Sequence, residues 1–299
     1  MKFSRILLLA PLFLIGCFDS DDDGLTNAEE KELGTNPDKA DSDGDGLDDG
    51  DEVDEGTDPD NADTDGDGLS DGDEMDAGTD PLEIDSDADG YRDGDEVAEG
   101  SDPTDSSSLI YTGGWPYNAD KDSLDGPELG DAGDQEGDLF PRIKMVDQFG
   151  DIVDLYDFAN QGKPVMVDIS AMWCGPCHYY AQWLSGDDSE GAATYYDSAY
   201  PGISEAVHNG DIYWVTVMGE DNSGNATGET SEDWYSYYPD DNIPVLADET
   251  HELSDDYIVA WPSMYLLNED MTINARPGNP NGSDYYEPLD VLVEIVEDL

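Results

Sequence analysis

Residues 164–177 read P-V-M-V-D-I-S-A-M-W-C-G-P-C, and this stretch decides the fold of the C-terminal half of the chain. Val165 to Ile169 is apolar except for Asp168, which predicts a buried strand. The strand runs directly into two cysteines at C-x-x-C spacing, and Tyr179 to Leu184 continue a short helix after them. A pair this close indicates dithiol chemistry, because structural disulfides normally span longer separations.

The flanking segments predict the other elements of this domain. Ile143 to Val146 and Ile152 to Leu155 lie on either side of a turn and predict a hairpin. Ile212 to Met218 predicts a second core strand. The pattern is completed by a helix over 230–238, a hairpin that joins 263–267 to 271–273, and a C-terminal helix with Pro288 in its first turn.

With His178 the motif also spells C-x-x-C-H, the pattern of covalent haem attachment. Haem is not expected, because it needs a pocket and usually a second axial ligand, and an apolar strand that ends at Trp173 does not suit a haem loop. A zinc site is not expected either, since no second closely spaced ligand pair exists. His178 is then a residue of the first helical turn, and it either tunes the thiols or is only solvated.

The opening stretch resembles the active-site strand and turn of thioredoxins. The wider segment from Leu139 to Leu299 is similar to the redoxin branch of that family, including I-P-V-L-A-D at 243–248 and W-P-S-M-Y-L-L at 261–267. The resemblance implies an α/β fold, with a central mixed sheet flanked by helices, and a redox-active disulfide. Thiol peroxidase activity is a minor alternative, although such redoxins resemble one another in a Thr or Ser where this chain has Ala171.

The resemblance also implies roles for five residues. Cys174 matches the attacking cysteine, placed at a helix N-terminus whose dipole favours the thiolate. Cys177 matches the resolving cysteine. Asp168 matches the buried carboxylate that exchanges protons with the inner thiol. Trp173 matches the aromatic residue beside the site, with a plain core tryptophan as the alternative. Pro262 matches the cis-proline that faces the cysteines, so a cis bond is predicted before it.

A second pattern covers residues 19–106, which repeat four times with a period of 22. In the second copy, D-S-D-G-D-G-L-D-D-G-D-E, acidic residues stand at loop positions 1, 3, 5, 9 and 12, and Gly46 stands at position 6. This is the spacing of a calcium loop, in which alternate residues of a tight turn supply hard oxygen ligands. The candidate ligands are Asp19, Asp21, Asp23, Asn27 and Glu30; Asp41, Asp43, Asp45, Asp49 and Glu52; Asp63, Asp65, Asp67, Asp71 and Glu74; and Asp85, Asp87, Asp89, Asp93 and Glu96.

The segments between the loops limit any helix to about two turns, as Gly56-Thr57-Asp58-Pro59 illustrates. Paired helices of a calcium sensor therefore do not fit. The array resembles thrombospondin type 3 repeats, which implies a chain wrapped around calcium ions with almost no apolar core. A disordered acidic linker is the alternative, but it does not explain the regular glycines and glutamates. We expect calcium to turn this self-repelling segment into a rigid spacer.

Charge and the first residues bear on partners and location. The chain has 76 Asp plus Glu against 10 Lys plus Arg, so nucleic acid is not expected as a partner. Residues 1–16 combine a basic start with an apolar run too short to span a bilayer, which is typical of an export signal. Leu14 to Cys17 resembles the lipobox of bacterial lipoproteins and implies lipidation of Cys17. An ordinary secreted protein is the alternative. Phe18 is not the Asp of inner-membrane retention, which favours the outer membrane.

The sequence thus predicts a signal peptide at 1–16, a lipidated start at 17–18, calcium repeats at 19–106, a linker at 107–138 and a redoxin domain at 139–299. The predicted function is a thiol-disulfide oxidoreductase, anchored by lipid in the bacterial envelope, that acts on envelope proteins with disulfides or thiols. It would depend on an unidentified electron donor, and the direction of electron flow stays open. The alternative is a calcium-dependent adhesion lipoprotein with a non-catalytic redoxin fold.

Overall fold

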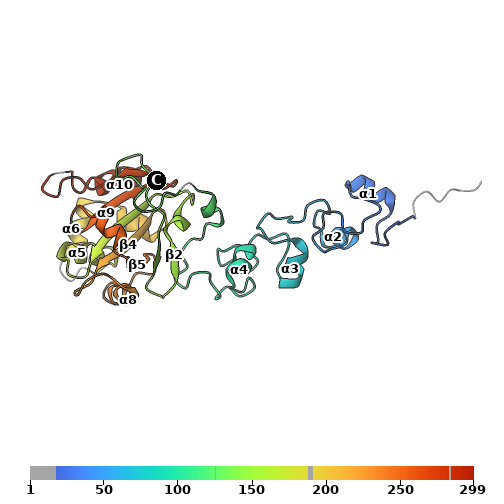
Figure 1. Cartoon of the computed structure of the whole chain (residues 1–299), viewed down its shortest axis with the longest axis horizontal. Helices are drawn as coiled ribbons and strands as arrows, with labels where there is room; N and C mark the ends of the chain where they lie inside the picture. The colour runs from blue at the N-terminus through green and yellow to red at the C-terminus, as the bar shows by residue number, and fades with distance from the viewer. Residues whose placement is uncertain (1–17, 125, 188–190, 283) are drawn as a thin grey trace, which may run out of the picture. The chain divides into compact units, whose positions relative to one another are not determined.

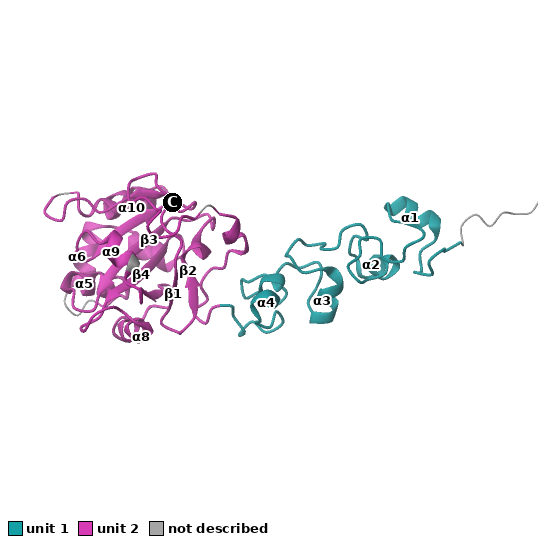
Figure 2. Cartoon of the chain, viewed as in Figure 1, with its two compact units in different colours: residues 1–110 teal, residues 111–299 magenta. Residues whose placement is uncertain are grey.

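The computed structural model describes residues 18–124, 126–187, 191–282 and 284–299 of the chain. The chain divides into two compact units, with the boundary between Ile110 and Tyr111 (Figure 2). The predicted signal peptide and the lipidation site at Cys17 lie outside the described residues. Within the described ranges, no helix combines the length and the apolar character needed to cross a bilayer.

The first unit consists of four copies of one loop and one short helix. The helices are α1 (Asn27–Leu33), α2 (Asp49–Glu55), α3 (Asp71–Ala77) and α4 (Asp93–Glu99). Each ends at a glycine in the left-handed conformation, so the predicted limit of about two turns is confirmed. Among the described residues of this unit, the buried large apolar side chains are Leu69 and Tyr91, whereas many carboxylates are buried. The unit therefore lacks an ordinary apolar core.

The second unit is built around a mixed seven-stranded sheet with the order β2-β1-β5-β4-β3-β6-β7 (Figure 1). Strands β3, β4 and β5 are parallel neighbours, while β6, β7, β1 and β2 pair antiparallel. The α/β fold with a mixed sheet, expected from the thioredoxin resemblance, is confirmed. The strands are β1 (Lys144–Val146), β2 (Ile152–Asp154), β3 (Val165–Ala171), β4 (Tyr213–Glu220), β5 (Val245–Ala247), β6 (Ser263–Leu267) and β7 (Ile273–Ala275).

Alternate side chains of the central strands point to opposite faces of the sheet. On one face, Met166 and Leu266 pack with helices α5, α7 and α10. On the other face, Tyr265 contacts Phe140 and Tyr257 through tilted and edge-on ring pairs. The helices of this unit are α5 (Gly175–Leu184), α6 (Ala192–Ala199), α7 (Ile203–His208), α8 (Gly228–Tyr237), α9 (Glu252–Tyr257) and α10 (Glu287–Glu297), and two 3₁₀ helices span η1 (Ala119–Ser123) and η2 (Leu155–Phe158).

Residues 111–138 belong to the second unit, although the sequence predicts a linker over 107–138. The first part, residues 111–123, is called the strap below. The Tyr111 hydroxyl donates to Asp157 Oδ2 at 2.7 Å, and the Trp115 indole N–H donates to Asp147 Oδ2 at the same distance. The linker prediction rested on a polar composition with isolated aromatics. Those aromatics pack because each has an apolar ring to bury and a polar atom that a buried carboxylate satisfies.

Candidate functional site

Cys174 and Cys177 lie where β3 ends and α5 begins. Cys174 is the N-cap residue of α5, and Pro176 lies in the first turn, where its missing N–H costs no helical hydrogen bond. The two cysteines form a disulfide. The Cys177 backbone N–H donates to Cys174 Sγ at 3.1 Å. Both residues are buried in this oxidised form, Cys174 at 3% and Cys177 at 0% exposure, so a reacting partner must approach through the side chains that cover them.

Two tryptophans flank the dithiol. Trp173, for which the sequence left a core position open, is 51% exposed, and its indole N–H donates to Glu220 Oε2 at 2.8 Å. Its ring meets the ring of Trp261 edge-on, with 5.6 Å between centroids. The Trp261–Pro262 peptide bond is cis, as predicted. The exposed indole ring of Trp173 beside the cysteines offers an apolar surface to a polypeptide.

Asp168 is a buried carboxyl group in the middle of β3, with 3% exposure. Burial raises its pKa to about 7, and a hydrogen bond from the Ser170 hydroxyl at 3.0 Å partly opposes this shift. A cavity of about 20 Å³ lies beside it, lined also by Ala181 of α5. Ala181 is one turn after Cys177 on α5, so the cavity reaches the helix that carries the inner cysteine, although Cys177 itself does not line it.

His178 is held between the dithiol turn and α8. Its Nε2 donates to the Met172 carbonyl oxygen at 2.8 Å, and its Nδ1 lies 2.6 Å from the Tyr238 hydroxyl. The ring also packs against Trp234, with 4.8 Å between centroids. Both ring nitrogens are therefore occupied by protein partners, and the side chain positions the loop before Cys174.

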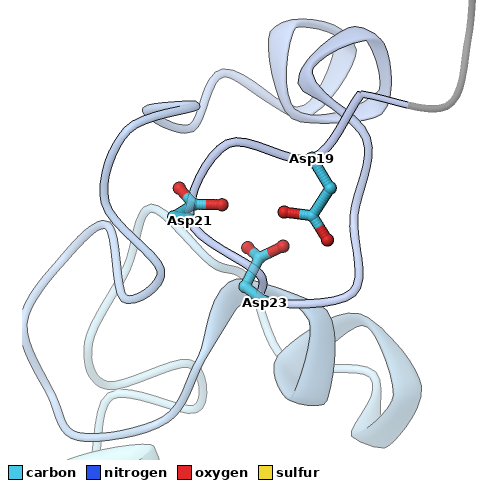
Figure 3. Close-up of side chains that lie close together, drawn as sticks. All are labelled: Asp19, Asp21 and Asp23. Atoms are coloured by element: carbon cyan, nitrogen blue, oxygen red, sulfur yellow. The ribbon is translucent and has the colours of Figure 1, made fainter.

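The calcium loops bring carboxylates together within each repeat. Asp19, Asp21 and Asp23 turn their oxygens toward one space inside the first loop (Figure 3), and one ligand atom of each lies within 4.8 Å of the others. The same holds for the triads 41, 43 and 45 and 63, 65 and 67. In the fourth loop, burial and, after it, repulsion from neighbouring carboxylates raise the pKa of Asp87. Positions 1, 3 and 5 therefore converge as the sequence predicts.

A second kind of cluster joins consecutive repeats. Asp23 and Glu30 of the first repeat lie with Asp49 of the second, again within 4.8 Å. Asp45, Glu52 and Asp71 form the equivalent cluster between the second and third repeats. The sequence assigns each position-9 residue to its own loop, and in the structure Asp49 and Asp71 are bonded to their own loops and also lie beside the carboxylates of the repeat before. The reason is that position 9 begins each helix, and the helix starts against the preceding loop.

These clusters fit a bound cation. Both carboxylate oxygens of Glu30 and Glu52 are buried and make no hydrogen bond to the described protein atoms. Burial, followed by repulsion from surrounding carboxylates, raises the pKa of Glu52 and of Glu74 to about 8, and that of Glu96 to about 7. Buried carboxylates without donors are costly, and a hard cation with oxygen ligands removes that cost.

Sequence reasoning did not single out the polar residue at loop position 2. Ser42 donates to Asp49 through its backbone N–H at 2.6 Å and its hydroxyl at 2.7 Å. Thr64 bonds Asp71 in the same way. The recurrence of Ser or Thr at this position every 22 residues was the available signal.

Comparison with protein families identifies the array. Residues 19–40, 41–62, 63–83 and 85–106 match the model of the bacterial TSP3 repeat, so the first unit is made of four such repeats. A comparison with curated proteins gave no match.

Solved structures resemble the remaining part of the chain. A thioredoxin-like protein from Bacteroides caccae is 13% identical, with 55% of this chain and 50% of that chain covered and a TM-score of 0.38. The pneumococcal exposed lipoprotein thioredoxin from Streptococcus pneumoniae is 18% identical over 53% of this chain and 99% of its own, with a TM-score of 0.35. The thioredoxin domain of a thiol-disulfide oxidoreductase from Bacteroides vulgatus is 21% identical over 53% and 98%, with a TM-score of 0.34. This chain thus spans half the length of the first of these proteins.

Proposed function

We propose that the second unit is a thiol-disulfide oxidoreductase that reduces selected disulfides of envelope proteins. The observation that carries the proposal is a disulfide at the N-terminus of α5, with the Cys177 N–H directed at Cys174 Sγ. After reduction, this N–H and the helix dipole would favour a thiolate at Cys174. A disulfide that only stapled the fold would need neither feature.

The reaction follows thiol-disulfide exchange. The Cys174 thiolate attacks one sulfur of the substrate disulfide, and the other substrate sulfur leaves as a thiolate. Cys177 then loses its proton and attacks Cys174 Sγ, which releases the second substrate thiolate and forms the Cys174–Cys177 bond. The substrate gains two electrons, and a separate dithiol donor must return two electrons to the protein.

Asp168 is proposed as the group that takes the proton from Cys177. Its raised pKa of about 7 lets it alternate between acid and base near neutral pH. The cavity of about 20 Å³ beside it has room for about one water molecule, which would relay the proton from the inner thiol. Trp173 and Trp261 are proposed as the surface that receives the substrate polypeptide.

The test is reduction of insulin by the full chain with dithiothreitol as donor. We expect the wild type to accelerate the reaction and Cys174→Ser to fall to the uncatalysed rate. Cys177→Ser should instead accumulate a mixed disulfide with the substrate. Equal rates for the wild type and Cys174→Ser would contradict the proposal and favour a non-catalytic adhesion protein. The reduction potential of the pair, measured against glutathione, decides whether the protein reduces or oxidises.

For the first unit we propose a calcium-binding spacer. What supports this is the match to TSP3 repeats together with buried carboxylates, such as Glu30 and Glu52, that have no donor among the described atoms. The residues that would hold the ions are the predicted aspartates and glutamates. The ions would supply charge compensation and hold the loops in one conformation.

Attachment to the membrane through Cys17 is proposed on the sequence L-I-G-C alone. Incorporation of a labelled fatty acid into the wild type, and its loss in Cys17→Ser, would support the anchor. A wild-type protein that takes up no label would exclude it.

A further inference from the structure

Each repeat of the array contacts the loop of the repeat before it. The Gly72 N–H of the third repeat donates to Asp45 Oδ2 of the second at 2.9 Å, and the Gly94 N–H donates to Asp67 Oδ2 at 2.7 Å. A Cβ on Gly72 would lie 2.5 Å from the Asp45 carbonyl oxygen, so the approach requires glycine. The first repeat has no repeat before it in the pattern and carries Ala28 at this position. The glycine therefore serves the contact between repeats.

Loop position 9, just before this glycine, also differs between the first repeat and the later repeats. Asp49 lies with Asp23 and Glu30 of the first repeat, although it also accepts hydrogen bonds from its own loop. In the first repeat this position is Asn27, whose amide donates to the Ser20 hydroxyl at 2.8 Å. An amide is thus enough to hold the residue's own loop. The carboxylate is present where a preceding site exists for it to complete.

We propose that the aspartate at position 9 of each repeat is a calcium ligand of the repeat before it, so that consecutive repeats share their sites. The inference rests on the calcium part of the proposed function. Glu52 is completely buried and has no hydrogen-bond donor among the described residues, and Asp71 of the next repeat supplies the carboxylate beside it. Occupying one site therefore fixes the start of the next helix, which makes the array a chain of coupled neighbours.

Each site takes a ligand from the repeat that follows it, so the site of the last repeat differs from the others. Gly94, the residue after Asp93, donates its N–H to Asp67 of the third loop at 2.7 Å, so the fourth repeat starts against the third loop as the third starts against the second. After the fourth repeat the pattern ends, because Trp115 and Pro116 stand where the next Asp and Gly would be. The fourth site is therefore one carboxylate short and binds its ion more weakly.

Terbium luminescence can assign each ligand to a loop. Tyr91 is the residue at position 7 of the fourth loop, where the other three repeats have leucine, and residues 19–106 contain no other aromatic side chain. A tyrosine at position 7 sensitises a terbium ion in its own loop. The full chain first receives Tyr91→Leu, which removes the natural reporter, and this protein serves as the blank. Adding Leu47→Tyr to it then places a reporter in the second loop.

The reporter is then combined with Asp71→Asn or with Asp49→Asn. We expect Asp71→Asn to weaken terbium binding at the Leu47→Tyr reporter by about tenfold, because one carboxylate ligand is lost. Asp49→Asn should change terbium binding at the Leu47→Tyr reporter by less than about twofold. It should instead weaken terbium binding at a Leu25→Tyr reporter in the first loop. Asp73→Asn is the matched control, since it removes the same charge from an exposed position of the same helix. Calcium competition repeats each comparison with the natural ion.

At the Leu47→Tyr reporter, a stronger response to Asp49→Asn than to Asp71→Asn, or a response to Asp71→Asn no larger than that to Asp73→Asn, would overturn the sharing of sites. The natural Tyr91 reporter should bind terbium about tenfold more weakly than the Leu47→Tyr reporter, and equal affinities would overturn the difference at the last site. No luminescence from any reporter would overturn the calcium assignment itself. That result would leave the thiol-disulfide activity of the second unit untouched, so the two failures are distinguishable.

Discussion

The surroundings of individual residues in the dithiol site could be predicted from the sequence to different extents. The resemblance to thioredoxins implied a buried carboxylate at Asp168, and Asp168 is buried. The exposure of Trp173 was left open, because an apolar neighbourhood in the sequence does not show which side of a turn faces solvent. His178 was expected near the thiols, but its contacts with Trp234 of α8 and with Tyr238, the residue after α8, join segments that are distant in the chain.

Asp168 should make stability depend on pH in a defined direction. Its pKa rises from 3.8 in the unfolded chain to about 7 in the folded protein, so folding is coupled to proton uptake between these values. Its contribution to the free energy of unfolding therefore falls as pH rises and is lowest above about pH 7. We therefore compare the free energy of unfolding of Asp168→Asn with that of the wild type. The difference should move in favour of the variant by about 4 kcal/mol from about pH 4 to pH 8, at roughly 1.4 kcal/mol per pH unit.

Urea unfolding of the oxidised proteins across this pH range measures the difference. The matched control is Asp211→Asn, at an exposed position, for which the difference from wild type should stay constant. A constant difference for Asp168→Asn as well would show that the buried carboxyl group has no raised pKa.

Elements with strong local signals were predicted, and those with weak signals were not. The β1–β2 hairpin, β3, β4, α5, the β6–β7 hairpin and α10 all lie within a few residues of their predicted ranges. Helices α6, α7 and α9 and strand β5 were not predicted as elements. They contain between 3 and 8 residues, too few for a clear helical or alternating period.

At the level of elements, the start of α3 against the preceding loop should tolerate no side chain. We expect Gly72→Ala to raise the calcium concentration needed to order the array, because its Cβ would lie 2.5 Å from the Asp45 carbonyl oxygen. The clash should lower the stability of the folded array by about 1–3 kcal/mol. This loss arises although alanine has a higher helix propensity than glycine, by about 1 kcal/mol. Circular dichroism during a calcium titration measures the midpoint.

Ala28→Gly is the matched control, because it exchanges the same residues at the same loop position of the first repeat. It should cost only the helix propensity of about 1 kcal/mol. Equal midpoints for Gly72→Ala and the wild type would contradict the close approach of α3 to the second loop.

The strap depends on one buried ion pair of the second unit. Lys121 Nζ lies 2.6 Å from Asp157 Oδ1, which is fully buried. We expect Asp157→Asn to lower the free energy of unfolding by about 3 kcal/mol, because Lys121 would keep a buried charge without its partner. Asp122→Asn should lower the free energy of unfolding much less, since Asp122 pairs with Arg142 at an 86% exposed position where water screens the charge. Chemical denaturation compares the two variants. Equal losses of unfolding free energy would show that the ion pair between Lys121 and Asp157 does not hold the strap.

At the scale of the whole molecule, the two units are stabilised by different forces. The second unit has extended clusters of buried apolar side chains around its sheet. In the first unit, 37 Asp plus Glu face three Lys plus Arg within residues 19–106, so that unit needs counter-charge to stay compact.

Removal of calcium should therefore unfold one unit and spare the other. With a chelator, we expect small-angle scattering to show an expanded array, while tryptophan fluorescence and thiol-disulfide activity stay as they are in millimolar calcium. The contrast is available because all six tryptophans lie between residues 115 and 261, in the second unit. Identical scattering with chelator and with calcium would exclude the calcium-rigidified spacer.

The sequence by itself determined the features that depend on neighbours along the chain. These are the strand that leads into C-G-P-C, the 22-residue period, the convergence of loop positions 1, 3 and 5, and the helices that end at glycine. Each follows from spacing and backbone preference within a few residues, which any sequence displays directly.

Only the tertiary structure showed that the aspartates at position 9 also lie beside the preceding loop, that the strap packs on the second unit, and that Asp168 shares a cavity with α5. The physical reason is the same in all three cases. A residue that recurs every 22 positions gives the same pattern whether it serves its own loop or the loop before. Likewise, an aromatic residue in a polar segment gives no sign of the distant carboxylate that accepts its hydrogen bond. Such contacts are set by how separate segments pack, and packing is a property of the folded chain.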